Sequence, residues 1–289
     1  MVTRNDPGLY RRQVRTSLRD ARTTAGRTQL EAAAALDWSL SKVIRIEAGN
    51  VGVSTTDLLA LLTYYGVTDQ DLIDSLVAAA RASRLKPWWQ EYHEVIRPQF
   101  AQLLSYETGA SAVWTYSPTM ITALLQTADY ARAVRSEGVA DQHKRDQLVH
   151  LLLRRQEIFE GDDAPEAHFI VDEAALRRWV GGPAVMAEQL GHLLECMGRP
   201  RISIQVLPFS AGANPSLSGP FVLLRLPDSN DDVVFLEGNA GDMISHEDEE
   251  MRSKYFEYFE RLTAKCLSQD ASATFIRAVQ LEFAHGPAN

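Results

Sequence analysis

Apolar positions in the first 85 residues recur with the period of an α-helix. Their spacing predicts five helices, over residues 9–25, 29–35, 40–47, 55–65 and 69–84. Thr28 and Ser39 precede the second and third of these helices. Both can act as N-caps, because a hydroxyl oxygen accepts a hydrogen bond from a free N–H group of a first helical turn.

The two short helices over 29–35 and 40–47 are joined by a tight turn, which is helix-turn-helix geometry. We expect Val43, Ile44 and Ile46 to pack against the first helix of the pair. In this geometry the first helix crosses the DNA backbone and the second lies in the major groove. The side chains that would then face DNA are Leu40, Ser41, Lys42 and Arg45. An ordinary helical hairpin is the alternative interpretation.

Beyond Lys86-Pro87 the chain mixes helices with strands. Helices are predicted over 120–134, 141–159, 173–178 and 183–197, and a last long helix is predicted through Tyr255 and Leu262, where residues 245–248 can form a capping box. Alternating or continuous apolar runs predict strands over 168–172, 202–206, 220–226 and 233–236. The expected fold is mainly α, with a five-helix domain over 1–85 and an α+β domain over 86–289. The second domain would hold a small, mainly antiparallel sheet.

Aromatic side chains are concentrated between residues 88 and 130. They can form the wall of a ligand or partner pocket, or they can be the core of the second domain, and both interpretations stay open. The lining expected for a pocket is Trp88, Trp89, Tyr92, Trp114, Tyr116, Gln126 and Tyr130.

The charge of the chain is distributed unevenly. The formal net charge is −9, but residues 1–45 carry nine basic and four acidic side chains, which leaves a net of −14 on the remainder. A basic N-terminal segment on an acidic body fits a DNA-binding module attached to a regulatory or dimerising domain, since phosphate contacts are local. A solvated arginine face on the first helix is the alternative.

Signals for membranes and disulfides are weak. No apolar run approaches the roughly 20 residues that a membrane-spanning helix needs. The N-terminal residues lack the apolar core of a signal peptide. We therefore expect a cytoplasmic protein without a membrane partner. Cys196 and Cys266 have no metal-ligand spacing around them, so we expect two reduced, buried thiols.

Catalytic signatures are missing from the sequence. It contains no nucleophile elbow, zinc-protease motif, phosphate-binding loop or dinucleotide-binding loop. No catalytic residue, cofactor or metal is predicted, although an enzyme is not excluded. The acidic run over 246–250 fits the start of a helix, where carboxylates complement the helix dipole. His192 fits a core histidine.

Three N-terminal segments resemble the helix-turn-helix of the lambda-repressor or xenobiotic-response-element type. They are RDARTTAG (19–26), the pair Thr28-Gln29, and SLSKVIRIEAG (39–49). The resemblance implies that Gln29 touches a phosphate, that Lys42 and Arg45 bind backbone or base, and that Glu47 is structural. The cap residues Thr28 and Ser39 complete the DNA-binding set.

The second domain resembles one family over nearly its whole length. The segments that carry the resemblance are WWQEYHEV (88–95), YETGAS (106–111), ALLQTADYARAV (123–134), VDEAALRR (171–178), GGPAVMAEQLGHLLE (181–195) and IQVLPFSAGANPSLSGPFVLLRLPD (204–228). They are similar to actinobacterial regulators in which a helix-turn-helix precedes a DUF5753 domain, the Scr1-family antitoxin-like transcriptional regulators. The resemblance implies a homodimeric, sequence-specific transcriptional regulator. It also implies an effector or partner for the second domain, either a small molecule or a small DUF397-type protein.

A hypothesis of another class rests on two departures from that pattern. Leu40 and Ile44 replace polar residues, and leucine can contact only a thymine methyl group, whereas glutamine can pair with adenine. A regulator scaffold that no longer binds DNA could act as a small-molecule-binding protein. It could also be an enzyme without a motif, shaping its substrate in the aromatic pocket.

Overall fold

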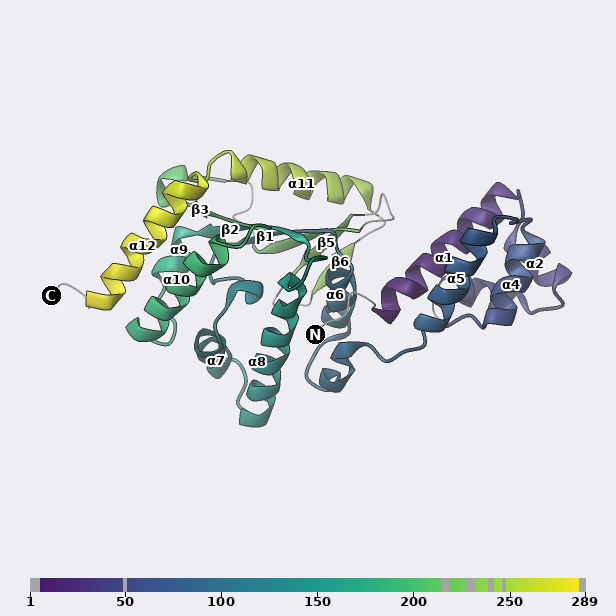
Figure 1. The fold of residues 1–289 in the computed structure, drawn as a ribbon, viewed down its shortest axis with the longest axis horizontal. Helices are drawn as coiled ribbons and strands as arrows, with labels where there is room; N and C mark the ends of the chain where they lie inside the picture. Colours follow the sequence, from purple (N-terminus) through teal and green to yellow (C-terminus); the bar gives the residue numbers. More distant parts are fainter. Residues whose placement is uncertain are drawn as a thin grey trace. The chain divides into compact units, whose positions relative to one another are not determined.

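The computed structural model describes residues 6–48, 51–214, 219–226, 232–238, 242–245 and 248–285. The chain divides into two compact units between Gln90 and Glu91. The N-terminal unit is helical, and the C-terminal unit combines helices with a sheet (Figure 1).

In its described residues the N-terminal unit contains the five predicted helices. They are α1 (Pro7–Thr24), α2 (Gln29–Ala35), α3 (Leu40–Glu47), α4 (Thr55–Tyr64) and α5 (Gln70–Ala82). Each begins at a side chain that accepts a hydrogen bond from the first turn, in order Asp6, Thr28, Ser39, Ser54 and Asp69. Thr28 and Glu31 form a complete capping box. Such a cap stabilises a helix by about 1 kcal/mol, so these starts are specified locally.

The core of this unit is apolar and includes Leu18, Val43, Leu58, Leu61 and Leu76. The predictions for Val43 and Ile46 are confirmed, since both are buried. The prediction for Ile44 is wrong, because 42% of its surface is exposed. Neighbouring positions on a helix lie about 100° apart, so Val43 and Ile46 share the inner face and Ile44 points away from it.

The described strands of the C-terminal unit form one six-stranded sheet in the order β3-β2-β1-β4-β5-β6. The strands are β1 (Ala112–Ser117), β2 (Glu166–Asp172), β3 (Ile202–Leu207), β4 (Phe221–Arg225), β5 (Val233–Leu236) and β6 (Met243–Ser245). β1, β2 and β3 pair in parallel, and the remaining three pairings are antiparallel. The predicted α+β fold of the second domain is confirmed, and its sheet contains both parallel and antiparallel pairs.

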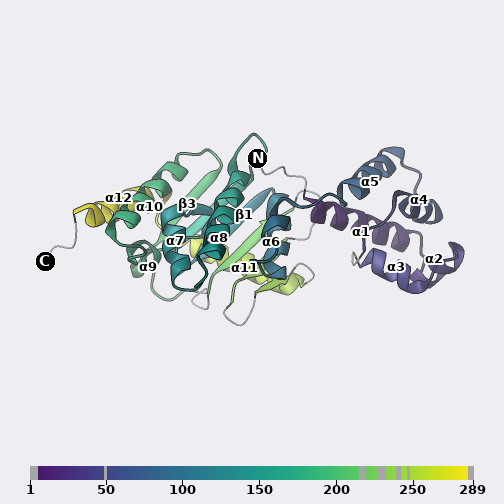
Figure 2. The ribbon, with the colours of Figure 1, turned by 90° about the horizontal axis from the view of Figure 1, so that it is seen from below.

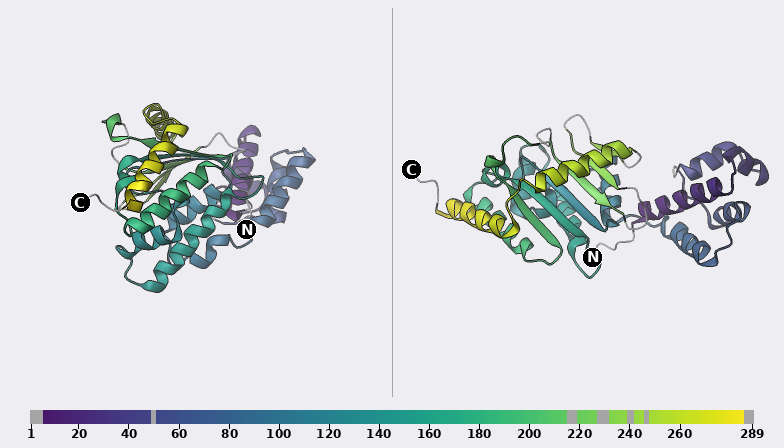
Figure 3. Two further views of the ribbon diagram at one scale, coloured as in Figure 1. Left: turned by 60° about the vertical axis from the view of Figure 1, so that its left-hand side comes forward. Right: turned by 90° about the horizontal axis from the view of Figure 1, so that it is seen from above.

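Helices cover both faces of this sheet. α11 (Glu249–Thr263) lies on one face, over an apolar cluster that includes Tyr116, Phe221 and Phe259 (Figures 1 and 3). The opposite face is covered by α6 (Pro98–Thr108), α7 (Ala128–Ser136), α8 (Gln142–Gln156) and α10 (Pro183–Met197), seen together in Figure 2. α9 (Glu173–Arg177) follows β2, and the last helix, α12 (Gln269–His285), packs on α10 and β3.

The structure corrects the predicted helix over 120–134. A short 3₁₀ turn, η2 (Ala123–Leu125), is followed by Gln126 in an extended conformation, and α7 starts only after Thr127. Distant amides satisfy this broken backbone. Gln156 Nε2 donates to the carbonyl groups of Ala123 and Gln126, and Gln189 bonds the backbone on either side of Gln126. Two long-range side chains, Gln156 and Gln189, thus override the local helix pattern.

Among the described α-helices and strands, four more were not predicted: α6, β1, β6 and α12. β1 is buried on both faces and therefore lacks the alternation of a half-buried strand. The proposed capping box for the last long helix is wrong, because Ser245 belongs to β6 and Asp248 caps α11. Residues 246 and 247 of the acidic run lie outside the described residues, while Glu249 and Glu250 occupy the first turn of α11 as expected.

Candidate nucleic-acid interface and an internal cavity

The helix-turn-helix is held together by one buried carboxylate. Glu47, the last residue of α3, is 1% exposed. It accepts hydrogen bonds from Arg22 Nε at 2.9 and 3.0 Å, from Gln29 Nε2 at 2.8 Å and from the Tyr65 hydroxyl at 3.1 Å. Burial, together with the negative charge of Glu47, raises the pKa of Tyr65, so this hydroxyl stays a donor. These bonds tie α3 to α1, to α2 and to the end of α4.

The start of α3 presents its side chains to solvent. Leu40 is 39% exposed and Ile44 is 42% exposed, and Ser41 and Arg45 are also exposed. Leu30, at the start of α2, is 63% exposed. Arg45 Nε bonds only weakly to the Ser41 carbonyl, at 3.3 Å. The exposed surface of the pair therefore combines apolar side chains with one available guanidinium group.

Lys42 is held by neighbours within the N-terminal unit. Its Nζ lies 2.9 Å from Asp57 Oδ1 and 3.6 Å above the centre of the Trp38 ring. An ammonium group bound to a carboxylate has its charge largely balanced. A phosphate would have to compete with Asp57 for this cation.

The seven predicted DNA-binding residues thus divide into two groups. Thr28, Ser39, Gln29 and Lys42 have structural partners, as caps or as ligands of Glu47 and Asp57. Leu40, Ser41 and Arg45 are exposed on α3. Whether each of them touches DNA stays a prediction.

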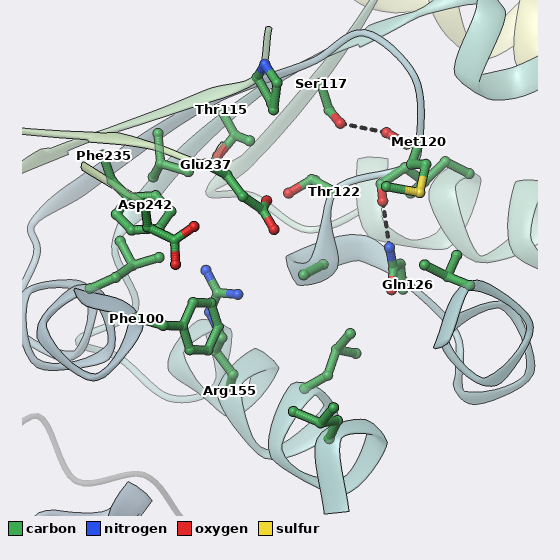
Figure 4. A pocket seen from close by; sticks show the side chains of 18 of the residues that line it. Phe100, Thr115, Ser117, Met120, Thr122, Gln126, Arg155, Phe235, Glu237 and Asp242 are labelled. Carbon is green, nitrogen blue, oxygen red and sulfur yellow. Dashed lines mark hydrogen bonds between the residues drawn. The ribbon is translucent and has the colours of Figure 1, made fainter. Parts of the chain in front are cut away.

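The C-terminal unit contains a partly open cavity of about 310 Å³ between the sheet and helices α6, α7 and α8. Its floor is the row Thr115, Val222 and Phe235, which face each other across β1, β4 and β5. Its walls include Phe100 of α6, labelled in Figure 4. Leu148 and Leu152 of α8 also line it. The cavity is thus an apolar space built on a rigid sheet.

Charged groups enter this apolar space. Arg155 on α8 is 5% exposed and forms a bidentate ion pair with Glu107, with Nη2 2.8 Å from Oε1. It also lies over the Phe100 ring at 5.2 Å. Arg97 pairs with Asp242 at 3.1 Å. Figure 4 shows Glu237 reaching into the same space from the side opposite Arg155.

Several buried polar atoms of the lining have no hydrogen-bond partner. They include Thr115 Oγ1, Gln126 Oε1 and Arg135 Nε. Burial lowers the pKa of Arg135, while the charge of Glu237 acts in the opposite direction. Leaving a buried polar atom unsatisfied costs about 1–3 kcal/mol, so three together at one cavity require an explanation.

The structure does not bring the seven expected pocket residues together. Trp88 and Trp89 belong to the N-terminal unit, where Trp89 Nε1 donates to Asp6 at 3.2 Å. Trp114 stacks on His168 at 5.7 Å, on the face of the sheet that α11 covers, because alternate residues of a strand point to opposite faces. Tyr116 belongs to the apolar cluster on that face, although it also borders the cavity, as Gln126 does. The predicted aromatic wall is therefore not formed: these aromatic side chains make separate contacts in different parts of the structure.

The remaining three residues of that set lie elsewhere in the C-terminal unit. Tyr92 bonds His150 Nδ1 at 2.6 Å, and the Tyr130 hydroxyl accepts from the backbone N–H of Ile121. Only Gln126 contributes an unsatisfied atom to the cavity described above. The lining residues Arg135 and Arg155 were not predicted. A charged residue on an apolar helix face, such as Arg155 or Glu107, is a sequence signal that could have indicated a buried charge.

Other site classes find little support in the described part of the chain. No group of three His, Cys, Asp or Glu side chains there could hold a metal ion. Within the same residues, no helix is long and apolar enough to cross a membrane. Cys196 and Cys266 are free thiols, the first buried and the second partly exposed. His192 is partly buried on α10 and lies 3.5 Å from the Cys196 sulfur.

Comparison with known protein families agrees with the two units. A model of a helix-turn-helix domain matches residues 13–76, which makes the chain a DNA-binding regulator by class. A second model, described as a domain of unknown function, DUF5753, matches residues 100–278. The chain belongs to this DUF5753 family. Neither the curated proteins nor the solved structures contain a match to the chain.

Proposed function

We propose that this protein is a sequence-specific transcriptional regulator that binds double-stranded DNA as a homodimer through α3. One observation carries the proposal: the buried Glu47 carboxylate fixes α3 while its exposed residues stay free of the core. A helix that enters a groove must be oriented by partners outside the interface, because a loosely held helix loses contacts.

The exposed apolar side chains of the helix pair support a particular mode of readout. Leu30, Leu40 and Ile44 cannot exchange hydrogen bonds with base edges, but they can contact the methyl groups of thymine. Arg45 can supply a phosphate contact or a guanine contact. The operator is then recognised through thymine methyl groups together with a few charged contacts, and two half-sites about one helical turn apart would match a two-fold dimer.

The C-terminal unit is the regulatory part in this proposal. It responds to a small-molecule effector or to a small DUF397-type partner protein. The cavity lined by Thr115, Gln126 and Arg135 supports the first of these alternatives, because its lining is mostly apolar and contains unsatisfied polar atoms.

A salt titration of DNA binding tests the proposal. DNA from around the protein's own coding region is compared with an unrelated fragment of equal length. We expect preferential binding to the first fragment, with an affinity that falls steeply with salt because counterions are released from phosphates. Arg45→Ala should reduce the slope of log K against log salt by about 0.9 if Arg45 contacts one phosphate.

The matched control is Arg261→Ala, which removes an exposed arginine of α11 that pairs with Glu257. It should leave both affinity and slope unchanged. Equal effects of the two substitutions would show that the loss is a general effect of charge. Absence of binding to either fragment at low salt would refute DNA binding by this protein.

A further inference from the structure

The geometry of the C-terminal cavity points to a specific class of ligand: a small zwitterion of the amino-acid or short-peptide type with an apolar side chain. Its role as an effector rests on the proposed regulatory function, whereas its binding does not. Four features of the lining lead to this class.

The first feature is an acceptor that needs a donor. Gln126 is 4% exposed, and its Nε2 donates to the Ile121 carbonyl at 2.6 Å. Because a carbonyl oxygen only accepts, the amide orientation is determined, and Oε1 is left as the acceptor. Oε1 has no partner. A ligand that satisfies it must carry an N–H or O–H group.

The second feature is a cation that needs an anion. Of the three arginines that line the cavity, Arg155 pairs with Glu107 and Arg97 pairs with Asp242. Arg135 forms no ion pair with any carboxylate in the described part of the chain, and its buried Nε is unsatisfied. A guanidinium fork binds a carboxylate through two parallel hydrogen bonds.

The third feature is an anion on the same cavity. Glu237 is solvent-exposed and lines the cavity, and its charge reaches Arg135, although the two side chains do not pair. A ligand with one negative and one positive group can satisfy both, with its carboxylate on Arg135 and its ammonium group on Glu237 and Gln126 Oε1. A simple organic acid would leave Gln126 Oε1 without a donor and would offer no cation to Glu237, and a simple amine would leave Arg135 without an anion.

The fourth feature is the apolar remainder. Phe100, Leu148, Leu152, Val222 and Phe235 supply the surface on which an aliphatic or aromatic side chain would be buried. The volume of about 310 Å³ is at the lower end of the range for small-molecule sites, so the ligand is small. Thr115 Oγ1, 4% exposed and unpartnered on the floor, can serve either end as donor or acceptor.

The test uses the full chain and isothermal titration with two probes, L-phenylalanine and L-leucyl-L-phenylalanine. Each probe is paired with an N-acetylated form, which lacks the ammonium group, and an amidated form, which lacks the carboxylate. We expect at least one zwitterion to bind with a Kd below about 1 mM and each capped form to bind at least tenfold more weakly. No binding of either zwitterion, or equal binding of the capped forms, would overturn the proposal.

Substitutions locate the site. Arg135→Met and Glu237→Gln should each weaken the zwitterion at least tenfold. Arg132→Met is the matched control on α7, because Arg132 is exposed and pairs with Asp129 outside the cavity lining. If Arg135→Met fails to fold, Arg135→Lys keeps the charge but loses the two-pronged geometry, and it should still weaken binding. Equal affinity in the Arg135 and Arg132 variants would overturn the assignment.

The two proposals can fail separately. DNA binding is measured on the same preparation with and without the zwitterion. Ligand binding without DNA binding would refute the regulator and leave the cavity assignment standing. DNA binding without ligand binding would refute the zwitterion site and leave the regulator standing.

Discussion

The hydroxyl of Tyr65 gives the sharpest test of how the helix-turn-helix is held. Tyr65→Phe removes one donor from the buried Glu47 carboxylate and leaves the ring in the core. A hydrogen bond to a charged group contributes about 1.5–3 kcal/mol to stability. For a unit of this size, each kcal/mol shifts the midpoint of thermal unfolding by about 4–8 °C, which predicts a loss of about 6–24 °C.

The perturbation at the other end of this bond should be larger. Glu47→Gln removes the charge that pairs with Arg22 while the volume is retained. Breaking one side of a buried ion pair costs about 3–5 kcal/mol, and a value at the lower end is expected here because the remaining Arg22 charge is only partly buried. That is a large part of the roughly 5–15 kcal/mol by which a domain is stable, so the N-terminal unit should be partly unfolded at 37 °C.

The assay follows thermal unfolding by hydrogen exchange of peptides from residues 29–65, which report the N-terminal unit separately. Tyr64→Phe is the matched control, since Tyr64 is the neighbouring tyrosine and contacts the Tyr65 ring, with no hydrogen bond from its hydroxyl to Glu47. Its effect should stay within about 0.5 kcal/mol. If Tyr65→Phe is no more destabilising than Tyr64→Phe, the idea that Glu47 organises α3 is wrong.

Four further predictions follow from individual contacts. Asp57→Asn releases Lys42 from its ion pair, so it should raise non-specific DNA affinity and increase the salt slope by about 0.9, measured by fluorescence anisotropy; an unchanged slope would mean that Lys42 does not reach phosphate. Glu107→Gln leaves the Arg155 charge buried without its partner and should destabilise the C-terminal unit by about 3–5 kcal/mol in urea denaturation, against a surface change such as Glu257→Gln. Burial lowers the pKa of His168, so the unfolded chain takes up the proton at a higher pH than the folded chain does. The contribution of His168 to stability should therefore be complete above about pH 6.5 and fall as the pH drops below that value. His168→Phe, which keeps the stack on Trp114, should flatten this pH dependence of stability. Burial raises the pKa of the Cys266 thiol to about 12 and also raises the pKa of Cys196, so neither should react with a thiol reagent at pH 8 until urea is added, and rapid labelling of the native protein would contradict this.

The N-terminal helices could be predicted because their signals are local. Thr28 and Ser39 cap helices by accepting a hydrogen bond from a backbone N–H three residues further on. The helical period alone predicts which apolar residues of α3 face the core. The predicted helices α8, α10 and α11 of the second domain follow the same logic, and α10 begins at Pro183 as predicted, since proline fits a first turn.

The predictions failed where distant residues decide the local conformation. The helix expected through residue 126 is broken because the side chains of Gln156 and Gln189 satisfy its backbone from other helices. β1 is buried on both faces, so its pattern carries no alternation. The aromatic pocket failed for a related reason: Trp114 and Thr115 are neighbours in sequence but lie on opposite faces of the sheet.

By itself, the sequence determined the helix-turn-helix, the division into a helical part and an α+β part, and the family, because caps, periodicity and motif spacing are properties of short segments. Only the tertiary structure decided which charges are available. In the folded chain, Lys42 pairs with Asp57, and Glu47 is buried among three donor side chains. Thr115, Gln126 and Arg135 come from a strand, a loop and a helix and line the same cavity. The physical reason is that a hydrogen bond or ion pair depends on distances of about 3 Å between atoms far apart in the chain, and no local pattern encodes such distances.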